Sequence, residues 1–168
     1  MADGLVALRL LIIDDNAQMR TIIGAVLSGA GVRNLHFAQD GREALQIVAG
    51  GGIDACFVDY EMPVLNGLDF VSRIRGMPGN ERFMPLIMLT GYSDMPRLST
   101  ARDRGVNEFL RKPVSARDIL SRLEAVILYP RQFITSPNYF GPDRRRHRAG
   151  VYEGPLRRAS DAVTSLQV

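Results

Sequence analysis

Five short apolar runs recur along the first two thirds of the chain, and each has the length of a strand. They cover residues 8–13, 35–37, 55–58, 85–89 and 106–110. Short runs that are apolar at consecutive positions are typical of strands buried on both faces of a sheet. A five-stranded, mainly buried sheet is therefore expected.

Segments with helical spacing of apolar residues follow each of these runs. Asn16, Asp40 and Ser115 precede three of them, and such side chains commonly cap helix N-termini. Two further helices are predicted around Leu68 and around Leu98, the second with a weaker pattern. Strands that alternate with helices form parallel sheets covered on both faces, and right-handed crossovers favour a doubly wound α/β fold.

Composition narrows the class of protein. The chain has 168 residues, of which 46% are hydrophobic, and this suits a globular domain with a full core. No apolar run approaches the ~20 residues that a membrane-spanning helix needs, so no membrane insertion is expected. The N-terminal stretch lacks a basic segment before its apolar residues and is interpreted as a first strand, not a signal peptide. Cys56 is the single cysteine and cannot form an internal disulfide, which fits a cytoplasmic location.

The basic residues are almost all arginine, and they outnumber the acidic residues only in the C-terminal part of the chain. Residues 1–129 hold 14 basic and 15 acidic residues, whereas residues 130–168 hold 7 and 3, a net charge of +4. Twenty of the 21 basic residues are arginine, and the single lysine is Lys112. This bias suggests that Lys112 stands where a planar guanidinium cannot replace a compact ammonium.

Charged and polar residues stand where the predicted strands end. Asp14 and Asp15 follow the first strand, Asp59 the third, Thr90 the fourth and Lys112 the fifth. In doubly wound sheets, ligands bind outside the carboxyl ends of the strands, so these side chains are expected to converge. Three carboxylates repel one another, and a hard cation such as Mg²⁺ relieves that repulsion. A lysine and a hydroxyl beside them match the needs of phosphoryl transfer.

Each of these residues has a simpler interpretation when it is taken alone. Asp14 or Asp15 could cap a helix, Thr90 could simply end a strand, and Asp59 could be an ordinary surface acid. Phe109 alone would be a core residue. Their joint placement is what favours a phosphoryl-transfer site. The chain lacks a glycine-rich phosphate loop, so a nucleotide is not expected to be the phosphodonor at this site.

Four motifs at the strand ends resemble those of one family. "LIIDDN", "VDYEMPVLNG", "PLIMLTG" and "VNEFLRKPV" are similar, in order and spacing, to the motifs of receiver domains in bacterial two-component response regulators, including the chemotaxis regulators. The resemblance covers residues 6–129 and implies a flavodoxin-like (βα)5 fold with strand order 2-1-3-4-5.

The resemblance also assigns the chemistry of the site. It implies that Asp59 accepts a phosphoryl group from a histidine kinase or a phosphotransfer protein. Asp14, Asp15, Asp59 and the backbone carbonyl of Glu61 would hold Mg²⁺. Lys112 would contact the phosphoryl group.

Further roles follow from the same resemblance. Thr90 and Phe109 would form a switch pair, and the Lys112–Pro113 peptide bond would be cis. Phe109 lacks the hydroxyl of a tyrosine, so it would switch by packing alone. Glu61 and Tyr92, two residues beyond Asp59 and Thr90, would flank the phosphoryl group and tune its lifetime.

The tail, residues 130–168, carries a repeat. "YFGPDRR" at residues 139–145 and "YEGPLRR" at residues 152–158 share the pattern Tyr-x-Gly-Pro-x-Arg-Arg. The candidate binding residues of the repeat are Tyr139, Arg144, Arg145, Tyr152, Arg157 and Arg158. The tail is too short for a separate output domain, and its Pro, Gly and Arg content predicts an extended, poorly ordered segment.

Several roles for the tail stay open. It could be a solvated linker, or a linear motif that docks on a partner or folds back on the receiver domain. Nucleic acid is a disfavoured partner because +4 spread over a flexible tail is a weak electrostatic footprint. A cyclic dinucleotide is a further candidate ligand for residues 144–148.

These observations predict a phosphorylation-controlled signalling protein rather than an enzyme, with self-phosphorylation and autodephosphorylation as its only reactions. Phosphorylation of Asp59 would draw in Thr90 and let Phe109 pack inward. This would remodel the face formed by the fourth helix, the fifth strand and the fifth helix, which would bind a downstream protein. The alternatives are a scaffold protein that acts through its tail, and a phosphate shuttle in a phosphorelay.

Overall fold

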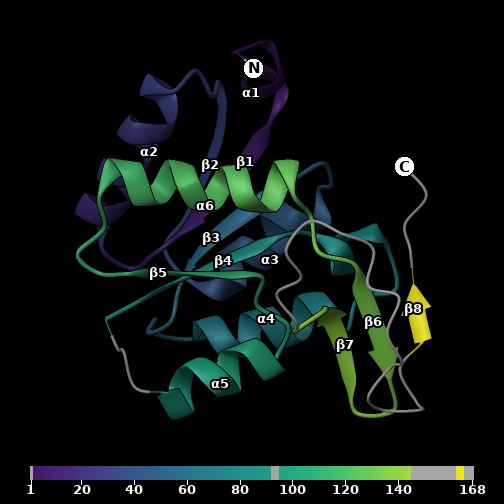
Figure 1. Ribbon diagram of the computed structural model, residues 1–168. Helices are drawn as coiled ribbons and strands as arrows, with labels where there is room; N and C mark the ends of the chain where they lie inside the picture. Colours follow the sequence, from purple (N-terminus) through teal and green to yellow (C-terminus); the bar gives the residue numbers. More distant parts are fainter. Residues whose placement is uncertain (1, 92–94, 145–161, 165–168) are drawn as a thin grey trace.

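The computed structural model describes residues 2–91, 95–144 and 162–164, and it contains a parallel five-stranded sheet between two layers of helices (Figure 1). The strands of this sheet are β1 (Arg9–Ile13), β2 (Asn34–Ala38), β3 (Ala55–Asp59), β4 (Leu86–Thr90) and β5 (Glu108–Arg111). All neighbouring strands are parallel, in the order β2-β1-β3-β4-β5. The doubly wound fold and its strand order are therefore confirmed.

Helices connect the strands. They are α1 (Ala2–Ala7), α2 (Ala17–Gly29), α3 (Gly41–Ala49), α4 (Gly67–Arg75), the 3-10 helix η1 (Asn80–Phe83), α5 (Met95–Asp103) and α6 (Ala116–Leu128). Helix α1 precedes β1 and was not expected from the apolar pattern. Within the described residues, no helix combines the length and the apolar character that crossing a membrane requires.

Two cores lie on opposite faces of the sheet because successive side chains of a strand point to opposite faces. Leu11 and Ile13 of β1 belong to a cluster with residues of α3 and α4, and Ala101 of α5 joins it. Leu10 and Ile12 belong to a second cluster with residues of α2 and α6. All five side chains of β3 and all five of β4 are buried, as expected for central strands of a parallel sheet.

Side-chain caps begin the helices where they were predicted. The side-chain oxygen of Asn16 accepts hydrogen bonds from the amides of Gln18 and Met19 at the start of α2. Asp40 caps α3 and Ser115 caps α6 in the same manner. Each cap satisfies helix amides that have no partner within the helix, and so it fixes the start of the helix.

Between residues 133 and 142, the tail is folded and not the extended, poorly ordered segment that was expected. Strands β6 (Phe133–Ser136) and β7 (Tyr139–Pro142) form an antiparallel hairpin, and β8 (Ala162–Thr164) pairs with the other edge of β6. Phe133 and Ile134 are each only 7% exposed, so this part of the tail buries enough apolar surface to fold. Figure 1 shows the hairpin beside the end of α5 that leads into β5.

Candidate functional site

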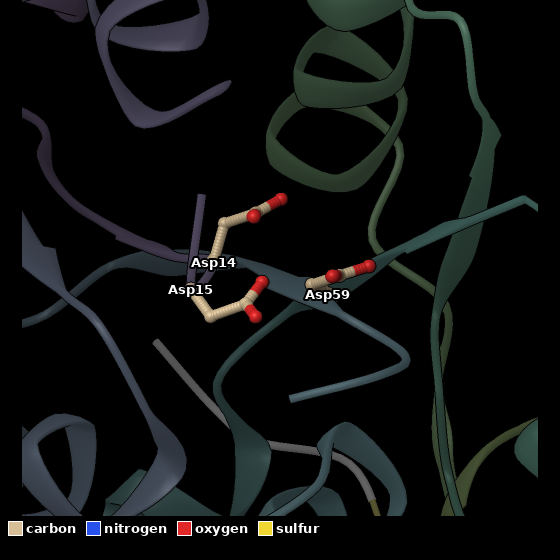
Figure 2. Close-up of side chains that lie close together, drawn as sticks. All are labelled: Asp14, Asp15 and Asp59. Carbon is tan, nitrogen blue, oxygen red and sulfur yellow. The ribbon is translucent and has the colours of Figure 1, made fainter. Parts of the chain in front are cut away.

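Three carboxylates lie at the carboxyl ends of two adjacent strands (Figure 2). Asp14 and Asp15 directly follow β1, and Asp59 is the last residue of β3. One carboxylate oxygen from each lies within 4.8 Å of the others. Asp14 is fully buried, Asp59 is 6% exposed and Asp15 is exposed. The convergence predicted from the chain order is therefore present, with Asp15 on the solvent side.

Lys112 completes the cluster from the end of β5. Its Nζ lies 3.0 Å from Asp14 Oδ2 and 3.0 Å from Asp59 Oδ1. The backbone amide of Lys112 donates to the carbonyl of Thr90, with an N–O distance of 2.8 Å. The Lys112–Pro113 peptide bond is cis, as the resemblance implied. The single lysine of the chain thus forms ion pairs with two buried carboxylates.

Burial and charge set the protonation of Asp59 and Lys112. Burial raises the pKa of Asp59 to about 6; the charge on Asp14 adds to this rise, and the hydrogen bond from Lys112 partly offsets it. Burial alone would lower the pKa of Lys112, but its hydrogen bonds to Asp59 and Asp14 outweigh this effect and raise the pKa. Asp59 is therefore ionised at neutral pH while it faces a fixed cation.

Two residues that sequence reasoning missed contact the backbone of the acidic cluster: Arg20 contacts Asp14 and Asp15, and Gly67 lies against Asp59. Nη1 of Arg20 donates to the carbonyl oxygens of Asp14 at 2.6 Å and Asp15 at 3.3 Å. A side chain at Gly67 would place its Cβ 2.1 Å from the carbonyl oxygen of Asp59, so the backbone there requires glycine. The position of Arg20, one turn into the helix after the acidic pair, was the available signal.

The predicted switch residues lie on neighbouring strands. Thr90 ends β4 and is 3% exposed. Phe109 of β5 is half-buried and packs against the core cluster shared by α3 and α4. The register pairs Phe109 with Met88 and Thr90 with Arg111. Phe109 therefore lies on the strand next to that of Thr90, two residues before the position that pairs with Thr90.

An open cleft of about 460 Å³ borders the acidic cluster. Its lining residues are Asp15, Tyr60, Glu61, Met62, Pro63, Asn66 and Leu68. Glu61 also forms an ion pair with Arg97 of α5, with a nitrogen–oxygen distance of 3.7 Å. Tyr92, the other predicted tuning residue, lies outside the described residues.

The first tail motif does not join the acidic cluster. Gly141 of β7 lies against Gly105, which precedes β5, so the motif is at the opposite end of the sheet from Lys112. The Tyr139 hydroxyl donates to the carbonyl of Pro142, and the Arg144 guanidinium lies 3.9 Å from the centre of the Tyr139 ring. The remaining predicted motif residues lie outside the described residues; they are Arg145, Tyr152, Arg157 and Arg158.

The acidic cluster fits a magnesium ion. Its donors are carboxylate oxygens, which Mg²⁺ prefers, and exposed Asp15 leaves room for the waters that Mg²⁺ retains. Asp14 and Asp59 share one lysine cation, which leaves excess negative charge among three adjacent carboxylates. A divalent cation would balance that charge.

A doubly wound sheet with acids and a lysine at its strand ends defines a known class of protein. The chain belongs to the response regulator receiver domain family, which it matches over residues 10–124. Receiver domains are modules of two-component signalling, and the predicted resemblance is thereby confirmed.

Curated relatives and solved structures agree with this assignment. The chain is 33% identical to chemotaxis protein CheY1 of Helicobacter pylori, over 71% of this chain and 97% of the relative. It is 32% identical to response regulator MprA of Mycolicibacterium vanbaalenii, where the match spans 71% of this chain but only 50% of the relative. Among solved structures, chemotaxis protein CheY4 of Vibrio cholerae matches with a TM-score of 0.67 and 30% identity, over 71% of this chain and 98% of that one.

Proposed function

We propose that this chain is a phosphorylation-controlled signalling protein whose Asp59 accepts a phosphoryl group from a histidine kinase or a phosphotransfer protein. The observation that carries this proposal is the buried Asp59 carboxylate, which shares the Lys112 ammonium with Asp14 at the strand ends of a receiver fold. The similarity to chemotaxis proteins supports an output through protein binding.

The geometry supports a direct displacement at phosphorus. An oxygen of the ionised Asp59 carboxylate forms the new O–P bond as the P–N bond to the donor histidine breaks, and the bonding pair leaves with the imidazole. The Lys112 ammonium, 3.0 Å from Asp59 Oδ1, is placed to bind a phosphoryl oxygen. Mg²⁺ held by Asp14, Asp15, Asp59 and the carbonyl of Glu61 would neutralise phosphoryl charge.

Hydrolysis of the acyl phosphate returns the protein to its starting form. Glu61 lines the cleft beside Asp15, so its side chain is placed to influence the water that enters. We assign Glu61 and Tyr92 to the control of phosphoryl lifetime. The ion pair between Glu61 and Arg97 links that control to α5.

The output is a change in the face formed by α5, β5 and α6. The Thr90 hydroxyl would bind a phosphoryl oxygen, and Phe109 would pack inward on the neighbouring strand as Thr90 moves. This rearrangement alters the surface offered to a downstream protein. The tail is a second candidate for partner binding, because its hairpin lies beside α5, which belongs to this face.

Asp59→Asn tests the phosphoacceptor. Wild-type protein incubated with acetyl phosphate and Mg²⁺ is expected to gain one phosphoryl group by intact mass, and Asp59→Asn is expected to gain none. Asp69→Asn is the matched control, because Asp69 of α4 does not belong to the acidic cluster, and this variant should leave labelling unchanged. Equal labelling of Asp59→Asn would place the acceptor elsewhere.

Thr90→Ala tests the switch separately. This variant should still be labelled, because Asp59 and Lys112 remain in place. Beryllofluoride, a phosphoryl mimic, should change hydrogen exchange in β5 and α6 of the wild type and have a much smaller effect in Thr90→Ala. A full response in the variant would contradict the switch.

A further inference from the structure

The tail hairpin, residues 131–144, is seated on the receiver domain through an aromatic cluster. The Phe83 ring lies 5.2 Å from the Phe133 ring and 5.3 Å from the Phe140 ring, centre to centre. The guanidinium of Arg82 lies 3.6 Å from the centre of the Phe140 ring. Edge-to-face ring contacts and a cation stacked on a ring depend on geometry, so the hairpin has a defined docking position next to η1.

The buried side chain of Arg75 contacts both this docking position and the segment between α5 and β5. Nε and Nη2 of Arg75 donate to the carbonyl of Gly105 at 3.0 and 2.8 Å, and Nη2 also donates to Asn107 Oδ1 at 2.8 Å. The same guanidinium lies 5.0 Å from the centre of the Phe133 ring. One side chain therefore touches both the hairpin and the entry to β5.

The backbones of β7 and the α5–β5 connection are in close contact. A Cβ at Gly105 would lie 3.2 Å from the carbonyl oxygen of Phe140, and a Cβ at Gly141 would lie 2.9 Å from the Cα of Gly105. Gly105 also has φ of +99°, which disfavours any residue with a side chain. The connection cannot shift toward the hairpin without displacing it.

Two ion pairs hold the ends of the same connection. Arg144 Nη1 lies 3.2 Å from Oδ1 of Asp103, the last residue of α5. Arg131 pairs with Glu108, the first residue of β5, which Arg122 of α6 also approaches at 3.6 Å. The tail hairpin therefore binds the connection on both sides of Gly105, at Asp103 and at Glu108.

Strand β5 leads directly from this docking surface to the acidic cluster. It has only four residues, and it runs from Glu108, which is bound to the tail, to Arg111. Lys112 comes next and is bound to Asp14 and Asp59. At ~3.3 Å per residue, this short strand is a stiff link of roughly 13 Å between the tail and the phosphoacceptor.

We propose that docking of the tail hairpin restrains α5 and β5, so that docking and occupation of Asp59 by a phosphoryl group oppose each other. This inference rests on the proposed function. The docked contacts coexist with a Lys112 ammonium bound to both carboxylates, which is the arrangement of unmodified Asp59. A phosphoryl group draws Lys112 and Thr90 toward itself, and this displaces β5 and α5 from the tail. Linkage then requires that a bound phosphoryl mimic weakens docking by the same factor by which docking weakens binding of the mimic. Weakening the docking by mutation should therefore raise the affinity for the mimic, up to that factor.

Hydrogen exchange on the full chain tests the restraint. Beryllofluoride with Mg²⁺ is expected to accelerate exchange of the β6 and β7 amides by about fivefold or more, the usual lower range of coupling between sites. Arg144→Gln and Asp103→Asn are each expected to tighten beryllofluoride binding. The double variant should add little to either change, because both remove the same ion pair. Arg42→Gln, an exposed change on α3, is the matched control and should leave both measurements unchanged.

The outcomes separate this inference from the proposed function. If beryllofluoride alters exchange in β5 and α6 while β6 and β7 are unchanged or slowed, the restraint is refuted and the phosphoacceptor stands. Wild-type β6 amides that exchange at the rate of an unfolded peptide would also refute it. If acetyl phosphate labels no residue and beryllofluoride alters no segment, the proposed function itself fails.

Discussion

Asp59 occupies an environment that favours its neutral form, yet its chemistry requires the ionised form. Burial and the neighbouring Asp14 charge raise its pKa to about 6, and the Lys112 ammonium limits the rise. The carboxylate is thus ionised at neutral pH, although its surroundings favour the protonated form. Such a poised nucleophile is typical of functional sites.

The first prediction concerns the pH dependence of stability in metal-free protein. Because the pKa of Asp59 is raised from 3.8 to about 6, the folded state holds its proton more tightly than the unfolded state does. The stabilising effect of this proton is fully present below about pH 4 and is lost as the pH rises through about 6. Asp59→Asn should remove this dependence and stabilise the protein at pH 7 by on the order of 2 kcal/mol.

Urea unfolding with a chelator, repeated from pH 4 to pH 7, measures this effect. Glu124→Gln is the control and should keep the wild-type profile, because Glu124 is exposed on α6 and lies outside the acidic cluster. An Asp59→Asn variant that is less stable than wild type at pH 7 would contradict the assigned environment.

The second prediction concerns Gly67. An alanine there would place its Cβ 2.1 Å from the carbonyl oxygen of Asp59, and the backbone would have to move. Gly67→Ala should therefore lower the free energy of unfolding by about 3 kcal/mol, the upper end of the usual overpacking cost. Gly29→Ala is the matched control, because a Cβ there meets nothing within 4 Å. It should stabilise α2 by ~0.5 kcal/mol. Equal effects in the two denaturation curves would contradict the clash.

At the scale of elements, Arg75 of α4 links the segment that precedes β4 to the segment that precedes β5. Its guanidinium donates to the carbonyl oxygens of Arg82 and Met84 before β4 and to that of Gly105 before β5. Burial lowers the pKa of Arg75 to about 9, so the group remains charged at neutral pH. A planar guanidinium with several donors can satisfy these oxygens simultaneously.

The third prediction follows from that geometry. Arg75→Leu leaves several buried carbonyl oxygens without their donor and should cost about 3 kcal/mol or more in urea unfolding. Arg75→Lys keeps the charge but not the planar fork, and it should recover less than half of the loss. Arg73→Leu, an exposed change on the same helix, is the control and should stay within about 0.5 kcal/mol of wild type. A small loss in Arg75→Leu would show that the carbonyl oxygens find other partners.

At the scale of the whole molecule, the receiver domain has its acidic cluster at one end of the sheet and its tail hairpin at the other. Helices α5 and α6 and strand β5 connect the two ends. Binding at either end can therefore change the stability of the entire fold. Ligands that bind only the folded state raise its stability in proportion to the logarithm of their concentration.

The fourth prediction uses this linkage for the metal. Mg²⁺ at about 100 times its dissociation constant should stabilise the wild-type protein by ~2.7 kcal/mol in thermal unfolding. Asp15→Asn should respond much less, because it removes one of three clustered carboxylates. In chelator alone this variant should be at least as stable as wild type, because one repulsive charge is gone. A full Mg²⁺ response in Asp15→Asn would exclude Asp15 as a ligand.

The sequence by itself determined the doubly wound sheet, its helix caps and the members of the acidic cluster. Apolar periodicity and capping residues are local signals, and parallel strands necessarily bring their carboxyl ends to one edge. Asp14, Asp59 and Lys112 could thus be grouped before their distances were known, because each lies within two residues of the end of a predicted strand.

Only the tertiary structure decided how these groups and the tail are used. Burial divides three similar carboxylates into two that bind Lys112 and one that faces solvent. The tail has a composition typical of disorder, yet its residues 133–142 form a hairpin that packs against Phe83 and Arg75 from distant parts of the chain. Local composition does not encode such complementarity, because the surface that the tail buries exists only after the sheet and its helices have packed.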